Sequence, residues 1–199
     1  AIEVAGHTHE NIEEVANTTS DLDATPAQIS QWILESADPG SSKYSVPILV
    51  RFHSEVNLTS LSKSITQVVQ AHPPLRTTVR PVDESKDKFI QVVHPAPEAF
   101  PLEHRSVVSL STSDVEAVLR ELLKTPPSII KPSVARVVAL HVGDAILGVL
   151  WIVQHAAVDE WSIRVMLEDL DKALQGGEIL SRTPVPHSPP DSSEEVPDA

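Results

Sequence analysis

Residues 134–153 read VARVVALHVGDAILGVLWIV and contain two β-rich runs, Val134–Val142 and Ala145–Val153, which Gly143 and Asp144 join. A Gly-Asp pair between two such runs predicts a β-hairpin. The second run is apolar throughout, which is typical of a strand that is covered on both faces of its sheet. We therefore expect Ala145–Val153 to be an inner strand of the sheet.

Helices are predicted on both sides of this hairpin. Apolar residues recur at helical spacing after Asn57, which is placed to cap a helix that ends before Pro73. Ser113 and Glu116 form a capping-box pattern for a second helix, and a third is expected from about Ser162 to Leu174. The remaining predicted strands are Pro47–Phe52, Leu75–Val82 and Lys88–Val93. This order predicts an α+β fold with a mixed β-sheet flanked by helices.

The composition excludes several kinds of protein. The chain has 199 residues, which fits one domain or one lobe of a larger enzyme. It has no cysteine, so disulfides, thiolate metal sites and a cysteine nucleophile are excluded. The longest apolar run, Ala145–Val153, is far shorter than the roughly 20 residues that a membrane helix needs. With no signal-peptide pattern either, we expect a cytoplasmic protein that does not enter a membrane.

The net charge of −13 is concentrated at the two ends of the chain. We divide the sequence into an acidic N-terminal arm (1–23), a central domain (24–182) and an acidic tail or linker rich in Pro and Ser (183–199). The central domain holds 18 acidic against 15 basic residues, so it has no basic footprint for nucleic acid. His7 and His9 are the nearest approach to a metal-binding pattern, and because they lie in the arm we predict no metal site.

One segment could carry chemistry, and it follows the predicted inner strand directly. Residues 154–162 read QHAAVDEWS, so His155 stands where the backbone leaves the sheet. A histidine there could be structural, or it could serve as a general base for an amine or hydroxyl nucleophile. Asp159 precedes the last predicted helix, where a carboxylate can fix the loop through an arginine or through backbone N–H groups.

Five segments, in order, resemble the condensation domains of nonribosomal peptide synthetases, which belong to the chloramphenicol-acetyltransferase-like superfamily. Thr25–Leu34 resembles the opening Ser-x-Ala-Gln…Trp motif of the family, and Tyr44–Pro47 resembles its Tyr-Asn-Ile/Val-Pro strand start. Ala71–Val79 is similar to Arg-His-Glu-x-Leu-Arg-Thr-x-Phe, and Lys131–Arg136 to the Pro-Leu-x-Arg strand. Gln154–Ser162 is similar to His-His-x-x-x-Asp-Gly-Trp-Ser. The resemblance covers about residues 25–174 and implies the N-terminal lobe of such a domain.

The resemblance implies a site and its partners. His155 matches the catalytic histidine and Asp159 the aspartate of the motif, with Arg76 or Arg136 as the expected support of the loop. The family's substrates are thioesters on phosphopantetheine arms of carrier proteins, and no bound cofactor is expected. A C-terminal lobe completes the cleft in the family, and this chain ends where that lobe should begin. The residues next to His155 and Asp159 in the motif are expected to contact substrate: Gln154, Glu160, Trp161 and Ser162.

Two departures from the motif leave three hypotheses open. Gln154 stands where the family has its first histidine, and Glu160 stands where it has glycine. The chain could be the catalytic half of an acyltransferase or condensation enzyme that needs a C-terminal lobe. It could instead be a free-standing homodimeric relative with an altered reaction, or a non-catalytic binding or docking module. Size in solution separates the first two hypotheses, and thioester turnover separates both from the third.

Overall fold

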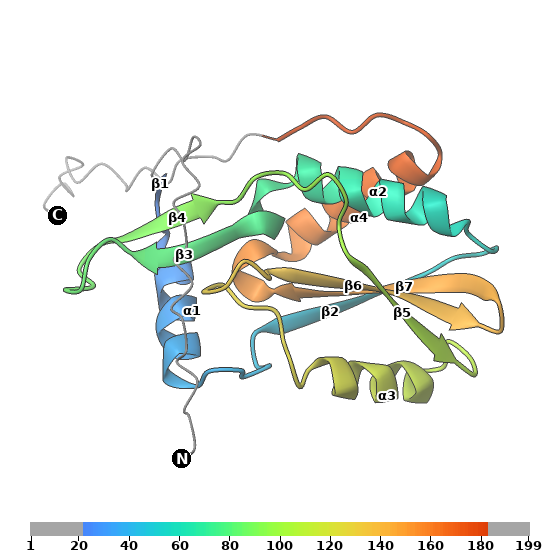
Figure 1. The fold of residues 1–199 in the computed structure, drawn as a ribbon, viewed down its shortest axis with the longest axis horizontal. Helices are drawn as coiled ribbons and strands as arrows, with labels where there is room; N and C mark the ends of the chain where they lie inside the picture. Colours follow the sequence, from blue (N-terminus) through green and yellow to red (C-terminus); the bar gives the residue numbers. More distant parts are fainter. Residues whose placement is uncertain (1–21, 183–199) are drawn as a thin grey trace, which may run out of the picture.

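The computed structural model describes residues 22–182, and a four-stranded sheet forms their centre (Figure 1). The strand order is β2-β7-β6-β5. β5 runs parallel to β6 and the other neighbours are antiparallel, so the sheet is mixed. The predicted α+β class and the inner position of the second hairpin strand are therefore confirmed. The bounds are Ser45–Arg51 for β2, Leu102–Val107 for β5, Ala135–Val142 for β6 and Ala145–Gln154 for β7.

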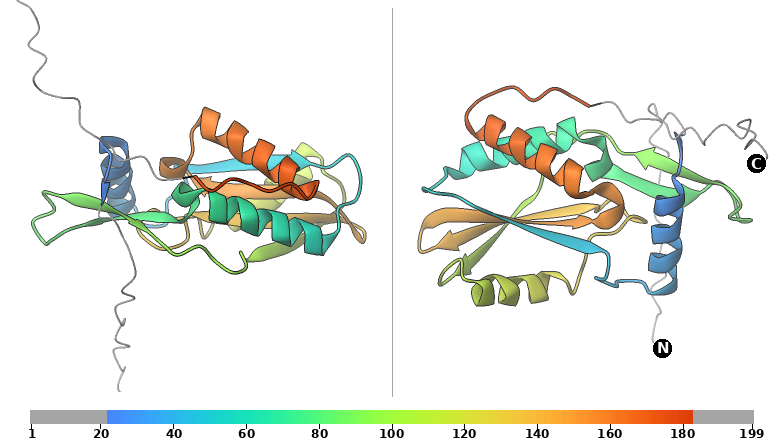
Figure 2. Two further views of the ribbon diagram at one scale, coloured as in Figure 1. Left: turned by 90° about the horizontal axis from the view of Figure 1, so that it is seen from above. Right: turned by 180° about the vertical axis from the view of Figure 1, so that it is seen from behind.

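Helices cover both faces of this sheet (Figures 1 and 2). The helices α2 (Leu58–Ala71) and α4 (Glu160–Leu174) lie on one face, and α3 (Thr112–Leu122) lies on the other. Side chains alternate along β7, so Trp151 packs on the side of α2 and α4, while its neighbour Ile152 packs on the side of α3. Both are fully buried, which explains why this strand is apolar at nearly every position.

The ends of the elements follow local chemistry. The Asn57 side chain accepts hydrogen bonds from the N–H groups of Thr59 and Ser60, so the predicted cap of α2 is confirmed. Gly143 has a φ of +63° in the hairpin turn, a conformation that glycine adopts without a Cβ penalty. The predicted capping box of α3 is wrong by two residues. Ser111 caps this helix, and Asp114 fixes its first turn by accepting hydrogen bonds from Ser109.

The structure has a second, smaller sheet, whereas the sequence predicted a single mixed sheet. Its order is β1-β4-β3, all antiparallel, and α1 packs against it through the edge-to-face contact of Trp32 with Phe89, whose ring centroids are 4.9 Å apart. Leu22 and Asp23, which the sequence division placed in the N-terminal arm, pair as β1 with Gln91 and Ile90 of β4. The bounds are Leu22–Asp23 for β1, Pro26–Ala37 for α1, Thr77–Pro81 for β3 and Phe89–Val93 for β4.

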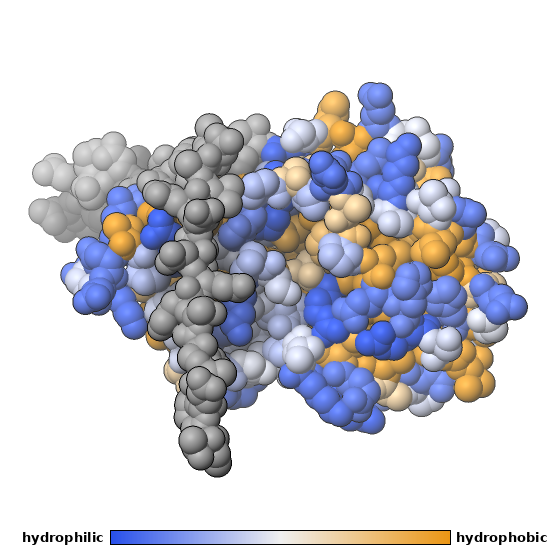
Figure 3. Space-filling view, in the orientation of Figure 1, coloured by the Kyte–Doolittle hydropathy of each residue, from blue (hydrophilic) through white to orange (hydrophobic). Residues whose placement is uncertain are grey.

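The described chain ends against α2 and α4. Arg182 donates its backbone N–H to the carbonyl of Ala71, and its guanidinium pairs with Asp169 at 2.8 Å. Most of the predicted arm (residues 1–21) and the predicted tail (183–199) lie outside the described residues. Figure 3 shows apolar side chains interspersed with polar ones on one face of the molecule. Across residues 22–182, none of the helices has the length and hydrophobicity needed to cross a membrane.

Candidate functional site

His155 lies where the inner strand of the large sheet ends. β7 ends at Gln154, and His155 begins a three-residue 3₁₀ turn (His155–Ala157) that leads toward α4. The backbone N–H of His155 donates to the carbonyl of Tyr44 at 2.8 Å, which ties the turn to the start of β2. The side chain of His155 is exposed, and no described residue forms a hydrogen bond with its ring. The backbone of this histidine is held in place while its imidazole remains accessible.

A hollow of about 460 Å³ opens beside His155. It lies between the His155 turn and the elements of the small sheet, so it is built from segments far apart in the sequence. Its polar wall includes Gln28 and Gln91, whose side-chain amides are joined by a hydrogen bond of 3.3 Å. The sequence does not indicate that these two glutamines lie near His155, because they reach the hollow only through the packing of α1 on β4.

Asp159 fixes the start of α4 and does so without an arginine. Its carboxylate accepts a hydrogen bond of 2.7 Å from the backbone N–H of Ser162, and its own N–H donates to the Ser162 hydroxyl at 2.7 Å. No ion pair of Asp159 occurs among residues 22–182. Of the two expected partners, backbone N–H groups are therefore the ones observed. These two hydrogen bonds engage the hydroxyl and the backbone N–H of Ser162, a residue that was predicted to contact substrate.

Because Asp159 is an N-cap, its replacement should have a moderate and pH-dependent effect. We expect Asp159→Ala to lower the free energy of unfolding by about 1 kcal/mol, and Asp159→Asn, which keeps an acceptor, to lower it less. Hydrogen bonds from the backbone and side chain of Ser162 lower the pKa of Asp159 below its ordinary value. A lowered pKa in the folded state means that the stabilisation is present above about pH 4 and is lost as the pH falls below it.

Denaturant unfolding of the wild type and of Asp159→Ala at a series of pH values measures this effect. The difference between the two proteins should shrink as the pH falls below about 4. A difference that stays constant down to about pH 2 would show that the Asp159 carboxylate does not contribute through its charge.

Two further residues of the motif lie in different surroundings. Gln154 is buried, with 3% of its surface exposed, and its side chain bonds to Glu35 and to the N–H of Ala156. This placement argues against the predicted contact of Gln154 with substrate. Glu160 and Trp161 lie exposed in the first turn of α4, and Trp161 has 71% of its surface exposed beside the guanidinium of Arg164.

Neither arginine that we expected to support the loop contacts it. Arg136 pairs with Glu103 through two hydrogen bonds of 2.8 and 2.9 Å and also donates to the carbonyls of Leu122 and Thr125. It therefore joins the end of α3 to β5 and β6. Arg76 donates to the carbonyls of His94 and Gln70. The expectation failed because both guanidinium groups donate to carbonyl groups at the ends of other elements instead of to the loop of Asp159.

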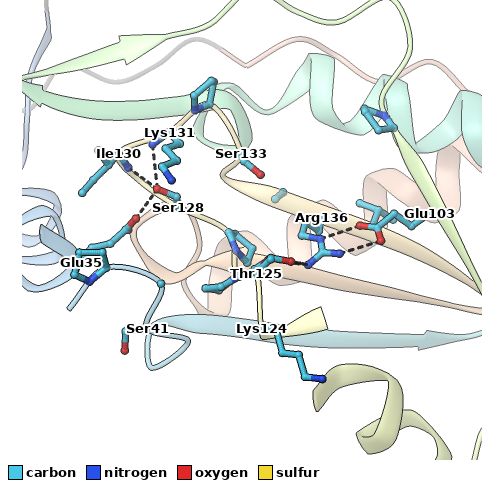
Figure 4. A pocket seen from close by; sticks show the side chains of 18 of the residues that line it. Glu35, Ser41, Glu103, Lys124, Thr125, Ser128, Ile130, Lys131, Ser133 and Arg136 are labelled. Atoms are coloured by element: carbon cyan, nitrogen blue, oxygen red, sulfur yellow. Dashed lines mark hydrogen bonds and ion pairs between the residues drawn. The ribbon is translucent and has the colours of Figure 1, made fainter. Parts of the chain in front are cut away.

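A larger hollow of about 930 Å³, which sequence analysis missed, lies on the side of Arg136 (Figure 4). Glu35 lies on its wall and bonds to Ser128, while Arg136 and Glu103 form a pair on the other side of the view. His155 does not line this hollow. Within residues 22–182, no three histidine, aspartate or glutamate side chains are grouped to hold a metal ion, and His7 and His9 lie outside that range.

Comparison with known proteins identifies the family to which this chain belongs. The family model of the Condensation domain matches residues 19–190. The chain therefore belongs to the condensation-domain family, and the resemblance seen in its motifs is confirmed.

Related sequences come from large synthetases. The chain is 29% identical over 164 residues to nonribosomal peptide synthetase kk1B of Curvularia clavata, covering 82% of this chain and 1% of the synthetase. It is 28% identical over 144 residues to nonribosomal peptide synthetase TES of Alternaria alternata, covering 72% of this chain and 3% of that protein. The chain thus spans only a small fraction of the length of these relatives.

Two solved structures show the same fold. One is the first condensation domain of the calcium-dependent antibiotic synthetase in complex with a substrate analogue, with 18% identity and a TM-score of 0.68 over 83% of this chain and 40% of that one. The other is the X-domain in its complex with OxyB from teicoplanin biosynthesis, with 19% identity and a TM-score of 0.64 over 92% of this chain and 39% of that one. The described lobe corresponds to about two fifths of each.

Proposed function

We propose that this chain supplies the catalytic histidine of an amide-forming condensation reaction. The amine of one substrate attacks the carbonyl carbon of a thioester on a carrier protein, so that a C–N bond forms and the C–S bond breaks. The ring of His155 orients the amine or accepts its proton, and the carrier thiol leaves with a proton. Phosphopantetheine arms would carry the substrates, as the resemblance implies, and a hydroxyl acceptor would give an ester by the same steps.

The accessible ring of His155 at the edge of the hollow is the observation that carries this proposal. The basic atom must come within about 2.6–3.2 Å of the heavy atom that carries the proton, so at least one ring nitrogen must be free of other partners. His155 meets this requirement among the described residues, because its backbone is anchored to Tyr44 while its ring is exposed. Asp159 supports the reaction indirectly, since it fixes the helix that follows the His155 turn.

The proposal requires a second lobe. The hollow beside His155 is open to solvent, and reaction of a thioester with an amine in competition with water requires a more closed site. A C-terminal lobe, or a second subunit in its place, would supply the opposite wall. The exposed indole of Trp161 lies in the helix that begins just beyond His155, where such a partner would cover it.

A single-turnover assay tests the proposed function. The full chain is combined with a condensation-domain C-terminal lobe supplied as a separate polypeptide, and with two carrier proteins loaded with an acyl and an aminoacyl group. We expect the amide product on the acceptor carrier to form faster than in a control without the chain. Product formation that is unaffected by the chain would contradict the proposal.

Docking without catalysis is a second candidate function. The similarity to the X-domain supports it, because that domain has been solved in a complex with a second protein, OxyB. A chain that binds carrier proteins or a second lobe but forms no amide would fit this function. Binding measured together with the turnover assay separates the two functions.

A further inference from the structure

The carboxylate of Glu35 joins three segments next to His155. It lies near the end of α1 and is partly buried. One oxygen accepts a hydrogen bond from the hydroxyl of Ser128, and the other accepts from the backbone N–H of Ile129 at 3.1 Å and from the side-chain amide of Gln154 at 3.3 Å. No cation pairs with this carboxylate among residues 22–182, so three hydrogen-bond donors stabilise it instead.

The contact with Gln154 fixes which way its carboxamide points. A glutamine side chain can usually be turned over, because its oxygen and nitrogen have similar shapes. Here the carboxylate of Glu35 can only accept, so it must face the NH₂ group of Gln154. The Gln154 oxygen then faces the backbone N–H of Ala156 and accepts from it at 3.3 Å. The hydrogen bonds thus run in one direction, from Ala156 through Gln154 to Glu35.

This chain of hydrogen bonds ends inside the turn that carries His155. The turn has only three residues, His155–Ala157, so the N–H of Ala156 is one peptide unit away from the catalytic candidate. The backbone on the other side is already fixed, because Gln154 donates its N–H to Val134 and His155 donates to Tyr44. Beyond His155, two hydrogen bonds hold the turn: its carbonyl accepts from the N–H of Val158 at 3.3 Å, and Ala156 donates to Gln154, whose carboxamide Glu35 holds.

We propose that Glu35 is a positioning residue for His155. It acts by holding the Gln154 carboxamide in the orientation that caps the 3₁₀ turn, and it does not contact substrate. The proposal rests on the function proposed for His155 as far as the rate is concerned, while its structural part can be tested without turnover. Because a displacement of about 1 Å at a reacting group can reduce a rate by about 10²-fold, a change at Glu35 should slow the reaction measurably.

The direction of the hydrogen bonds provides a sharp test by exchange of two side chains. In Glu35→Ala, the NH₂ of Gln154 and the N–H of Ile129 both lose their acceptor. In Gln154→Glu, two carboxylates face each other. The double variant E35Q/Q154E relieves this repulsion, because an NH₂ at position 35 then faces a carboxylate that still accepts from Ala156, although the N–H of Ile129 loses its acceptor. We expect each single variant to lose about 10–100-fold in single-turnover rate, and the double variant to recover to within about threefold of the wild type.

The ring of His155 gives a readout that does not need activity. Its carbon-bound proton signal in a ¹H–¹³C spectrum of the full chain can be assigned by its loss in His155→Ala. We expect this signal to move in both single variants and to return toward its wild-type position in the double variant. If the signal moves and returns while no variant, including the wild type, forms amide, the positioning role stands and the proposed function fails. An unmoved His155 signal in Glu35→Ala would overturn the positioning role.

Two controls separate positioning from general loss of stability. Ser128→Ala removes one of the two contacts of Glu35 with the loop and leaves those with Ile129 and Gln154, so it should lower the melting temperature without moving the His155 signal. Glu121→Gln changes an exposed carboxylate of α3 that pairs with Lys124, and it should change neither quantity. A displacement of the His155 signal in Ser128→Ala equal to that in Glu35→Ala would show that Glu35 acts only through the loop, and would overturn the proposal.

Discussion

Replacing His155 by alanine is expected to slow amide formation by about 10²–10⁴-fold, which is the range that a positioned general base contributes. The melting temperature should stay the same within about a degree, because surface substitutions away from special contacts usually change stability by less than about 0.5 kcal/mol. The ring of His155 is exposed and has no hydrogen-bond partner among residues 22–182. The measurement is a single-turnover rate with both loaded carriers and the second lobe, together with a thermal melt.

His53 provides a matched control for this experiment. It is also an exposed histidine, and it lies in the loop between β2 and α2, away from the hollow. His53→Ala should leave the rate unchanged within about twofold. An equal loss in His53→Ala and His155→Ala would show that the assay responds to a general property of the surface rather than to a base in the hollow.

The largest expected loss of stability at a charged residue belongs to Arg136. Arg136→Ala should lower the free energy of unfolding by about 3 kcal/mol, the lower end of the range for breaking one side of a buried ion pair. The Arg136 side chain is only 17% exposed, and its removal takes two donors from Glu103 and one from each of the carbonyls of Leu122 and Thr125. Denaturant unfolding followed by circular dichroism measures this difference.

Arg105 offers a direct comparison, because it contacts the same carboxylate of Glu103. Its guanidinium lies 3.3 Å from Glu103 and is 45% exposed, so the pair is well solvated. Arg105→Ala should therefore cost less than about 1 kcal/mol. If Arg136→Ala and Arg105→Ala lower the free energy of unfolding equally, the hydrogen bonds of Arg136 would stabilise the fold no more than an ordinary surface ion pair does.

Much of the fold could be predicted because it depends on local patterns. Two β-rich runs around Gly143-Asp144 predict the hairpin of β6 and β7. The continuous apolar character of β7 predicts its inner position in the sheet. The cap of α2 at Asn57 follows from a single side chain. The position of His155 at the exit of β7 followed from these, because the residue after an inner strand must leave the sheet.

The features that could not be predicted depend on contacts between distant segments. The sequence of β5, LEHRSV, has no regular alternation of apolar and polar residues, and it becomes a strand by pairing with β6 at the edge of the sheet. The partners of Arg136 lie 11 to 33 residues away, at the end of α3 and on β5, and no spacing rule identifies them. The sequence left open whether Asp159 bonds to an arginine or to backbone N–H groups. The structure shows that its carboxylate accepts from the N–H of Ser162 in the first turn of α4.

Gln154 shows the same limit inside the site. As a departure from the family motif it drew attention as a possible substrate contact, yet it is buried and bonds to Glu35, 119 residues earlier in the chain. Nothing in the sequence around Glu35 marks this residue. Its role became visible only when α1, the segment around Ser128 and the end of β7 were seen together.

The central claim is that His155, rather than its neighbour, carries the chemistry. The most direct test is the ratio of two single-turnover rates, those of His155→Ala and Gln154→Ala, measured with carrier-bound thioester and the second lobe supplied. We expect His155→Ala to be slower by at least about tenfold, because it removes the base itself, whereas Gln154→Ala only loosens the turn that holds the base. Equal losses in the two variants, or no loss in either, would contradict the catalytic assignment of His155.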